Sequence, residues 1–153
     1  MSWQDLVDGN PELAEFGAAR LLDSEVAYLA TVRKDGSPRV HPVTPIIGQG
    51  RLFVFMEPTS PKGYDLRRDG RYAMHCQVEN SEGGKGEFFL NGRARPVHDE
   101  ATRAIAVEAA SYEVAAHYIL FELGVRQAMS NVYTADGAVR QRWEGSIQAS
   151  AGS

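Results

Sequence analysis

The stretch ATVRKDGSPRVHPVTPI, residues 30–46, carries the strongest fold signal in the chain. Asp35-Gly36 is typical of the two-residue turn of a β-hairpin, and the residues on both sides are rich in β-branched and apolar types. The stretch therefore predicts two antiparallel strands joined by a tight turn. Pro42 and Pro45 cannot donate a backbone hydrogen bond, so we expect the second strand to lie at a sheet edge or to contain bulges.

Similar runs of strand-forming residues, separated by turns, continue along the chain. The predicted strands cover residues 26–33, 38–47, 51–56, 71–79, 86–97, 117–123 and 128–134. The first three follow one another through tight turns and predict an antiparallel meander. Because strands do not alternate with crossover helices, the pattern favours a mainly β fold, a closed antiparallel barrel, over a parallel sheet.

Helices are predicted at the margins of this barrel, each beginning at a residue that favours the helix N-cap. The caps are Ser2, Asn10, Ser60 and Asp99. Pro11 and Pro61 follow two of them in the first helical position. The first helix is expected to end at Gly9, the third before Gly70 and the last at about Ala116.

Length and composition indicate a single soluble domain. The chain has 153 residues, of which 43% are hydrophobic and 24% charged, as expected for one globular core. We expect this domain to occupy residues 1–145 and a small polar tail, residues 146–153, to be disordered. No run approaches the ~20 apolar residues of a membrane span, and residues 1–10 lack the basic start and apolar middle of a secretory leader. A cytoplasmic protein that does not bind membranes is therefore expected.

Nucleic-acid binding and metal chemistry are both disfavoured. The net charge is −4, and no basic stripe with interleaved aromatic residues marks a nucleic-acid surface. The single cysteine, Cys76, rules out an internal disulfide and a thiolate metal cluster. Cys76 is in step with Tyr72 and Met74 on a predicted strand, which indicates a thiol packed in the core. Its neighbour His75 leaves the opposite face, so the two cannot easily share a metal ion, and no metal site is expected.

Positive charge is concentrated in the middle of the chain. Residues 33–95 hold eleven Lys and Arg against seven Asp and Glu, which favours an anionic ligand in this region. Arg39 stands on the second strand and Lys62 in the first turn of the helix that begins at Ser60. A helix N-terminus carries about half a positive charge together with free N–H groups, so these residues predict a phosphate site. The alternative is a capped surface helix whose basic side chains point into water.

Three runs in this order resemble a known family. They are ATVRKDGSPRVHPVTPI, LFVFMEPTSPKGYDLRRDGRYAMHC and GEFFLNGRARPV, which lie within residues 24–98. Together they resemble the pyridoxamine 5'-phosphate oxidase-like family of FMN-binding split barrels. The resemblance implies a six-stranded antiparallel split β-barrel with flanking helices. It also implies a homodimer that binds a flavin or deazaflavin at the subunit interface.

The resemblance further implies a set of cofactor-binding residues. They are Arg39, Val40, His41, Pro42, Val43, Phe55, Met56, Ser60, Lys62 and Glu87. Arg39, Ser60 and Lys62 would hold the phosphate, with Pro61 in place of an Arg of the family's turn. The strand after Arg39 would run along the flavin ring, and Phe55 and Met56 would flank it. Glu87 stands where oxidases of this family usually place a glutamine.

The function implied is that of a dimeric flavin-dependent oxidoreductase acting on a small, hydrophobic or aromatic substrate, in which FMN transfers the hydride. The run LRRDGR, residues 66–71, also resembles members that use a deazaflavin, so a deazaflavin-dependent reductase is an alternative. Two others are a flavin- or haem-binding stress or storage protein without turnover, and a barrel that acts only as an interaction module. Oxidation of vitamin B6 is not expected, because near the C-terminus only Trp143, with Arg140 and Arg142, matches the substrate-binding segment of those enzymes. No catalytic residue is assigned.

Overall fold

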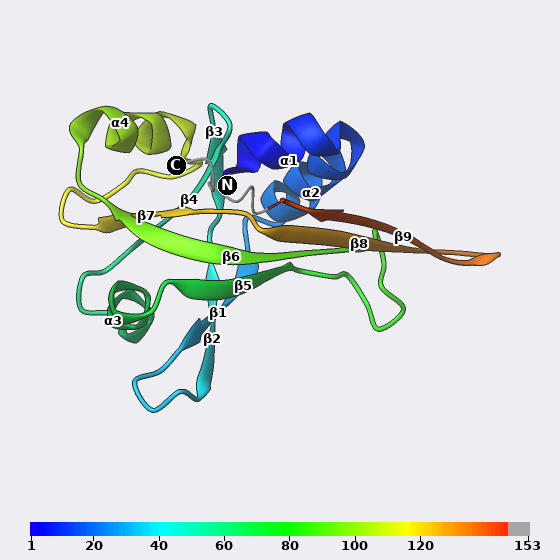
Figure 1. Ribbon diagram of the computed structural model, residues 1–153, viewed down its shortest axis with the longest axis horizontal. Coiled ribbons are helices and arrows are strands. Elements are labelled where there is room, and N and C mark those ends of the chain that lie inside the picture. The colour runs from blue at the N-terminus through cyan, green and yellow to red at the C-terminus, as the bar shows by residue number, and fades with distance from the viewer. Residues whose placement is uncertain (147–153) are drawn as a thin grey trace.

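One antiparallel sheet of nine strands organises the computed structural model of the protein, which describes residues 1–146. Four helices flank the sheet (Figure 1). The elements are α1 Trp3–Gly9, α2 Pro11–Asp23, β1 Ala27–Val32, β2 Pro38–Val43, β3 Ile46–Gly48, β4 Arg51–Met56, α3 Pro61–Arg68, β5 Arg71–Cys76, β6 Glu87–Val97, α4 Glu100–Ala109, β7 Ile119–Leu123, β8 Gln127–Thr134 and β9 Gly137–Glu144. Apart from Ser146, the tail predicted at 146–153 lies outside the described residues.

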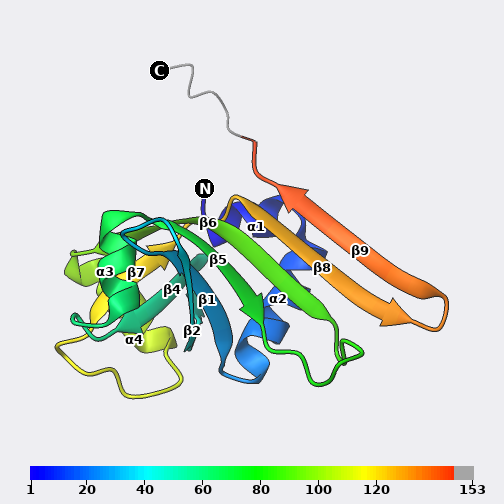
Figure 2. The same ribbon diagram turned by 90° about the horizontal axis from the view of Figure 1, so that it is seen from below.

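The long strand β6 joins the two parts of the sheet. Its first half pairs with β5 on one side and β8 on the other, and its second half pairs with β7. The strand order is β2-β1-β5-β6-β7-β4-β3, with the β8–β9 hairpin attached to β6. The sheet curls into a half-barrel, and the β8–β9 hairpin lies at the end remote from α3 and α4 (Figure 2). The predicted mainly β split barrel with flanking helices is confirmed, although the described part of the chain has nine strands and not six.

The predicted meander is wrong, because β2 and β4 do not pair. The segment predicted as one strand, 38–47, is divided between β2 and β3, which lie at opposite ends of the strand order. Pro45 lacks an N–H and restricts Thr44 before it, so the ladder is interrupted between the two strands. Among the strands within residues 1–146, β2 pairs only with β1, and the edge position predicted from its prolines is confirmed.

Two further features differ clearly from the prediction, the end of the last helix and the segment around Trp143. The last helix ends at Ala109 and not near Ala116, because Arg103 donates hydrogen bonds to the carbonyls of Ala116 and Tyr118 and so holds the following loop in a non-helical path. The segment around Trp143 forms β9, which was not predicted as a strand. Most of β9 is exposed on both faces, so it lacks the alternating apolar signal by which strands are recognised.

The predicted helix caps are confirmed. Ser2 accepts a hydrogen bond from Asp5 N and forms a capping box with it, and Asn10 accepts from Leu13 N. Ser60 and Asp99 cap α3 and α4 in the same way. These are contacts between residues three positions apart, and the local sequence therefore determines them.

The core consists of two clusters. The larger one lies between the concave side of the sheet and α1 and α2, and it includes Cys76, which is 1% exposed, as predicted. The smaller one lies between β3, β4, β7 and α4. Among the described residues no helix is long and apolar enough to cross a membrane.

Gly17 allows α2 to approach the sheet closely. The residue is buried in the middle of the helix, and a Cβ atom there would collide with the ring of Phe88. Phe88 is fully buried and packs edge-on against Trp3. A glycine normally weakens a helix by about 1 kcal/mol relative to alanine, so its presence here is explained by packing.

Gly17→Ala is therefore expected to lower the free energy of unfolding by about 1–3 kcal/mol, although helix propensity alone would raise it. Urea denaturation followed by circular dichroism measures the change. In a Phe88→Leu background the loss should be smaller, because part of the ring that obstructs the new methyl group is absent. An increase in stability of the single variant would show that the helix and sheet adjust without strain.

Candidate functional site

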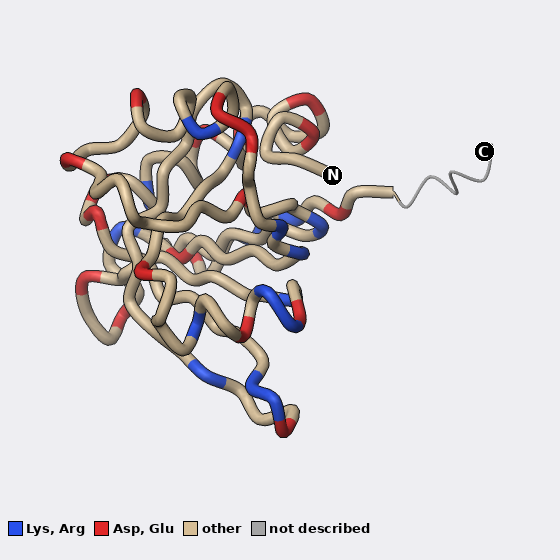
Figure 3. The backbone as a smooth tube through the Cα atoms, turned by 90° about the vertical axis from the view of Figure 1, so that its left-hand side faces the viewer, with Lys and Arg blue, Asp and Glu red and all other residues tan. Residues whose placement is uncertain are grey.

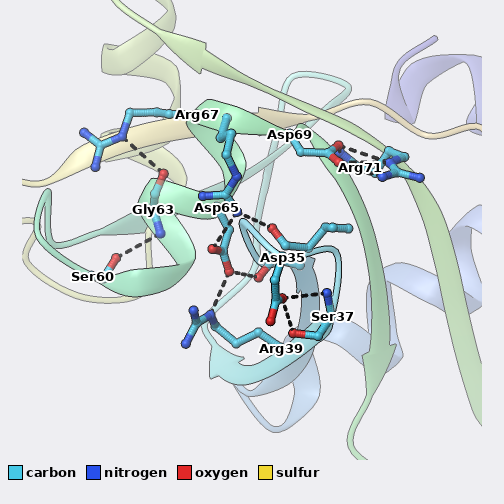
Figure 4. Close-up of polar contacts among 12 residues, drawn as sticks. Asp35, Ser37, Arg39, Ser60, Gly63, Asp65, Arg67, Asp69 and Arg71 are labelled. Carbon is cyan, nitrogen blue, oxygen red and sulfur yellow. Dashed lines mark hydrogen bonds and ion pairs between the residues drawn. The ribbon is translucent and has the colours of Figure 1, made fainter.

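The buried carboxylate of Asp65 fixes α3 to the first hairpin. Asp65 is 2% exposed. It accepts hydrogen bonds from Thr31 Oγ1 at 2.7 Å, Arg39 Nε at 2.7 Å and an Arg68 terminal nitrogen at 3.1 Å (Figure 4). Burial alone would raise the pKa of this carboxyl group, but the three hydrogen bonds outweigh it and hold the pKa below its usual value. Asp65 is therefore ionised at neutral pH and ties together β1, β2 and α3.

This ion pair also orients Arg39. Only Nε contacts Asp65, and the terminal nitrogens point away from it (Figure 4). Within the described part of the chain these nitrogens donate to no protein group. The side chain is 23% exposed, so a guanidinium that is held in place at one nitrogen remains open to a ligand at the other two.

Asp65 ties α3 to the strand that carries Arg39, and the charge of Lys62 in the first turn of α3 acts on His41 of that strand. Ser60 Oγ accepts a hydrogen bond from Gly63 N at 3.2 Å, and Pro61 contributes no N–H. Among residues 1–146 the backbone N–H of Lys62 has no protein acceptor. A Cβ at Gly63 would lie 3.0 Å from Ser60 Oγ and 3.3 Å from Met56 Sδ, so a glycine at this position leaves room for the cap residue and for Met56.

Lys62 and His41 complete this corner. Partial burial lowers the pKa of the Lys62 ammonium group, and none of the ion pairs among the described residues involves Lys62. Burial also lowers the pKa of His41, and the charges of Lys62 and Arg39 lower it further, so His41 is neutral at pH 7. We call Arg39, His41, Ser60 and Lys62 the Arg39 corner.

The other residues implied by the resemblance lie in different places. On β2, Val43 shares the inward face with Arg39 and His41, whereas Val40 and Pro42 are exposed on the other face. Met56 is buried in the larger core cluster. Phe55 is buried in the smaller one, with the Arg103 guanidinium 5.1 Å from its ring centroid.

Glu87 lies on the convex side of the sheet, apart from the Arg39 corner of the same chain. It accepts a hydrogen bond from Tyr133 Oη at 2.7 Å and from Asn131 Nδ2 at 3.5 Å. His75 Nε2 lies 3.8 Å away. Glu87 is thus placed by neighbouring strands β5 and β8.

The convex side of the sheet carries a row of apolar and aromatic side chains. The strand register aligns Pro42, Tyr28, His75, Phe89 and Met129 across β2, β1, β5, β6 and β8. The His75 and Phe89 rings stack with centroids 5.7 Å apart. Tyr28 is 42% exposed, and Val40, on the same side, is 66% exposed. We call this surface the outer face.

Sequence reasoning missed Asp65. Its partners Thr31 and Arg39 lie 34 and 26 positions away, so no local pattern reveals them. The only local signal is Arg68 three residues later, a spacing that is common on solvated helices. Among the described residues no group of three His, Cys, Asp or Glu side chains is placed to hold a metal ion.

Comparison with known proteins identifies the family. A family model described as Pyridoxamine 5'-phosphate oxidase matches residues 13–142. The chain belongs to this family. No curated protein matches the sequence.

Solved structures agree on the fold of this family member. A NimC/NimA family protein of Clostridium acetobutylicum has a TM-score of 0.66 at 19% identity, covering 93% of this chain and 96% of that one. PhzG of Burkholderia lata 383, in complex with tetrahydrophenazine-1-carboxylic acid, has a TM-score of 0.65 at 17% identity, covering 94% and 88%. A haem-binding protein of Mycobacterium smegmatis has a TM-score of 0.62 at 20% identity, covering 82% of this chain and 57% of that one. The chain thus spans little more than half the length of the last protein, and at these identities the likeness concerns the fold.

Asp65→Asn is expected to lower the free energy of unfolding at pH 7 by about 3 kcal/mol, because two guanidinium groups lose their buried counter-charge. The folded-state pKa of Asp65 is depressed. Its contribution is therefore complete above the unfolded-state pKa of about 4 and is lost as the pH falls through the lower folded value. The difference in stability between wild type and variant should shrink below about pH 4.

Urea denaturation of both proteins over this pH range measures that difference. Asp136→Asn, in the exposed β8–β9 turn, is the control and should leave the stability unchanged. A difference between wild type and Asp65→Asn that does not vary with pH would contradict the role assigned to the carboxylate.

Proposed function

We propose that this member of the family binds FMN through its phosphate at the Arg39 corner and acts as a flavin-dependent oxidoreductase on a small substrate. The proposal rests on one observation. The corner presents two terminal nitrogens of Arg39 and the ammonium group of Lys62, and none of these has a carboxylate partner among the described residues. Such a group of cations is suited to an anion.

The donor set fits a phosphate group. Arg39 can donate in the bidentate manner that guanidinium groups use with phosphate, and Lys62 adds its ammonium group and its free backbone N–H. The Ser60 hydroxyl can donate while its oxygen caps the helix. An anion would also reverse the effect of burial on Lys62, whose pKa is lowered in the free protein. Charge-assisted hydrogen bonds of this kind contribute about 1.5–3 kcal/mol each.

The edge strand β2 is suited to the ring of the cofactor. Since it pairs only with β1 among the described strands, its other edge presents unpaired backbone groups that can meet the polar edge of a planar heterocycle. His41 is neutral and adds no further positive charge. A bound flavin supplies hydride transfer, and the chain would orient it and exclude water.

We further propose that the protein is a homodimer with the cofactor at the subunit interface. The outer face exposes Tyr28 and Val40, and partly exposed Phe89 and Met129 lie between them and β9. A second copy would cover this apolar surface. It would also place the outer-face residues Pro42 and Glu87 at the interface where the cofactor is bound, although they lie apart from the Arg39 corner within one chain.

Titration of the purified protein with FMN is expected to produce a stable yellow complex. Lys62→Gln should weaken binding by about 10- to 100-fold, the equivalent of one charge-assisted hydrogen bond. Lys85→Gln is the matched control, because it removes the same charge from a lysine that pairs with Glu79 at 3.0 Å. It should leave FMN affinity unchanged.

Parallel titrations with a deazaflavin and with haemin distinguish the related functions. The deazaflavin shares the phosphate chemistry, and a solved relative is a haem-binding protein. Preference for the deazaflavin would change the cofactor but keep the site, whereas binding of haemin alone would refute the proposal. Reduction of the bound flavin by NADH or NADPH, and its reoxidation by a substrate, separates an oxidoreductase from a storage protein.

Sedimentation analysis is expected to show a dimer that Phe89→Glu converts to a monomer, because two carboxylates would then be buried at the apolar outer face. The monomer should also bind FMN more weakly. Val139→Glu, at an exposed valine on the opposite side of the sheet, is the control and should remain dimeric. The proposed interface would be contradicted if the wild type were a monomer and bound FMN with the same affinity as Phe89→Glu.

A further inference from the structure

A second concentration of positive charge lies away from the Arg39 corner. A hollow of about 610 Å³ lies between the β1–β2 turn, the end of α3 and the beginning of β5. A neighbouring hollow of about 440 Å³ shares Arg71 and Arg93 with it. The charged residues that line the two hollows are Arg33, Lys34, Arg68, Asp69, Arg71, Arg93 and Arg126. We call these two hollows together the basic groove.

The basic groove contains six cationic side chains and one carboxylate. In Figure 3 basic positions gather along one side of the lower half of the tube, from the β1–β2 turn upward. The whole chain has a net charge of −4, so a positive region is not expected from the overall composition. It therefore requires a local explanation.

The acidic residues of this region offset only part of the positive charge of the groove. Asp69 is engaged by Arg71, with a terminal nitrogen at 2.7 Å (Figure 4), and this contact lowers the pKa of Asp69 to about 2. Asp35 accepts two hydrogen bonds from Ser37, and these, together with the charge of Arg33, lower its pKa, but it forms no ion pair among the described residues. Within residues 1–146, no ion pair involves Arg33, Lys34, Arg93 or Arg126. Most of the positive charge in the groove is thus uncompensated.

The sheet register adds repulsion within the groove. Arg71 of β5 and Arg93 of β6 are directly opposite each other across the strand pair. Like charges at opposed positions destabilise an antiparallel pair. Asp69 hydrogen-bonds only Arg71, and Arg93 acts on this carboxylate through its charge alone. A bound anion between them would replace this repulsion by attraction. The opposed arginines are therefore unfavourable in the free protein and become favourable when an anion is bound between them.

We propose that the basic groove binds a small, multiply charged anion made of linked phosphate groups. Five of its six cations are arginines, whose planar donors match phosphate oxygens in pairs. Two adjoining hollows suit a ligand with more than one anionic group. Among the described residues that line the groove, the only aromatic one is Tyr72, which is 5% exposed. This part of the chain therefore offers no aromatic platform for bases there, which disfavours single-stranded nucleic acid. This site is separate from the Arg39 corner. Arg71 and Arg93 project from the same side of the sheet as the outer face, four residues along β5 and β6 from His75 and Phe89.

Isothermal titration with tripolyphosphate tests the proposal on the full-length protein. Wild type should bind it, and Arg93→Gln should bind about tenfold more weakly, the loss expected for one cationic contact. Arg140→Gln, which removes the same charge from β9 outside the groove, should bind as wild type does. Lys62→Gln should keep its affinity for tripolyphosphate while losing affinity for FMN, and Arg93→Gln should show the opposite pattern.

Four results would overturn the proposal. Equal weakening in Arg93→Gln and Arg140→Gln would indicate attraction by net charge alone, and weakening only in Lys62→Gln would place the ligand at the Arg39 corner. Absence of binding to wild type would remove the site. Tighter binding of a single-stranded oligonucleotide, increasing with its length, would indicate nucleic acid instead. Thermal melting and sedimentation of Arg93→Gln confirm that its fold and oligomeric state are those of wild type, and Arg33→Gln provides a second variant in the groove.

Discussion

The arrangement of the whole candidate site depends on one buried carboxylate. A charged group with 2% exposure is tolerated only when its hydrogen-bonding capacity is satisfied. Asp65 achieves this with donors from β1, β2 and its own helix, namely Thr31, Arg39 and Arg68. Those three hydrogen bonds fix the position of α3 relative to the β1–β2 hairpin. The first turn of α3 is thereby held near β2. The Arg39 corner is therefore a consequence of the hydrogen bonds that the Asp65 carboxylate accepts.

Asp65 has opposite effects on ligand binding at this corner. It neutralises part of the charge of Arg39, which weakens the long-range attraction of an anion. It also fixes the guanidinium at Nε, so fewer side-chain rotamers are lost when a ligand binds to the terminal nitrogens. Since a partly buried site depends on directed hydrogen bonds more than on net charge, the second effect favours selective recognition of phosphate geometry. Lys62, which has no ion-pair partner among the described residues, supplies the charge that Asp65 removes.

A feature could be predicted from the sequence when the residues that form it lie close together in the chain. The caps at Ser2, Asn10, Ser60 and Asp99 were correct because each is a hydrogen bond within one turn, and the edge position of β2 followed from the missing N–H groups of its prolines. The meander was predicted wrongly, and the strand β9 and the role of Asp65 were missed, because pairing across the sheet and burial of a charge depend on residues distant in sequence. The family resemblance supplied the split barrel. It did not reveal that β2 and β4 do not pair and stand far apart in the strand order.

The two positive regions lie at opposite ends of α3 and must attract anions by different means. At its beginning, the helix adds the partial positive charge and free N–H of its first turn, so a few side chains suffice for one phosphate. At its end the helix dipole has the opposite sign and repels anions, so the basic groove depends on side-chain charge alone. Because exposed charges are screened by salt far more than buried hydrogen bonds, binding in the groove should respond more strongly to ionic strength. Anion recognition at the beginning of α3 thus depends mainly on directed hydrogen bonds, and recognition at its end depends mainly on charge.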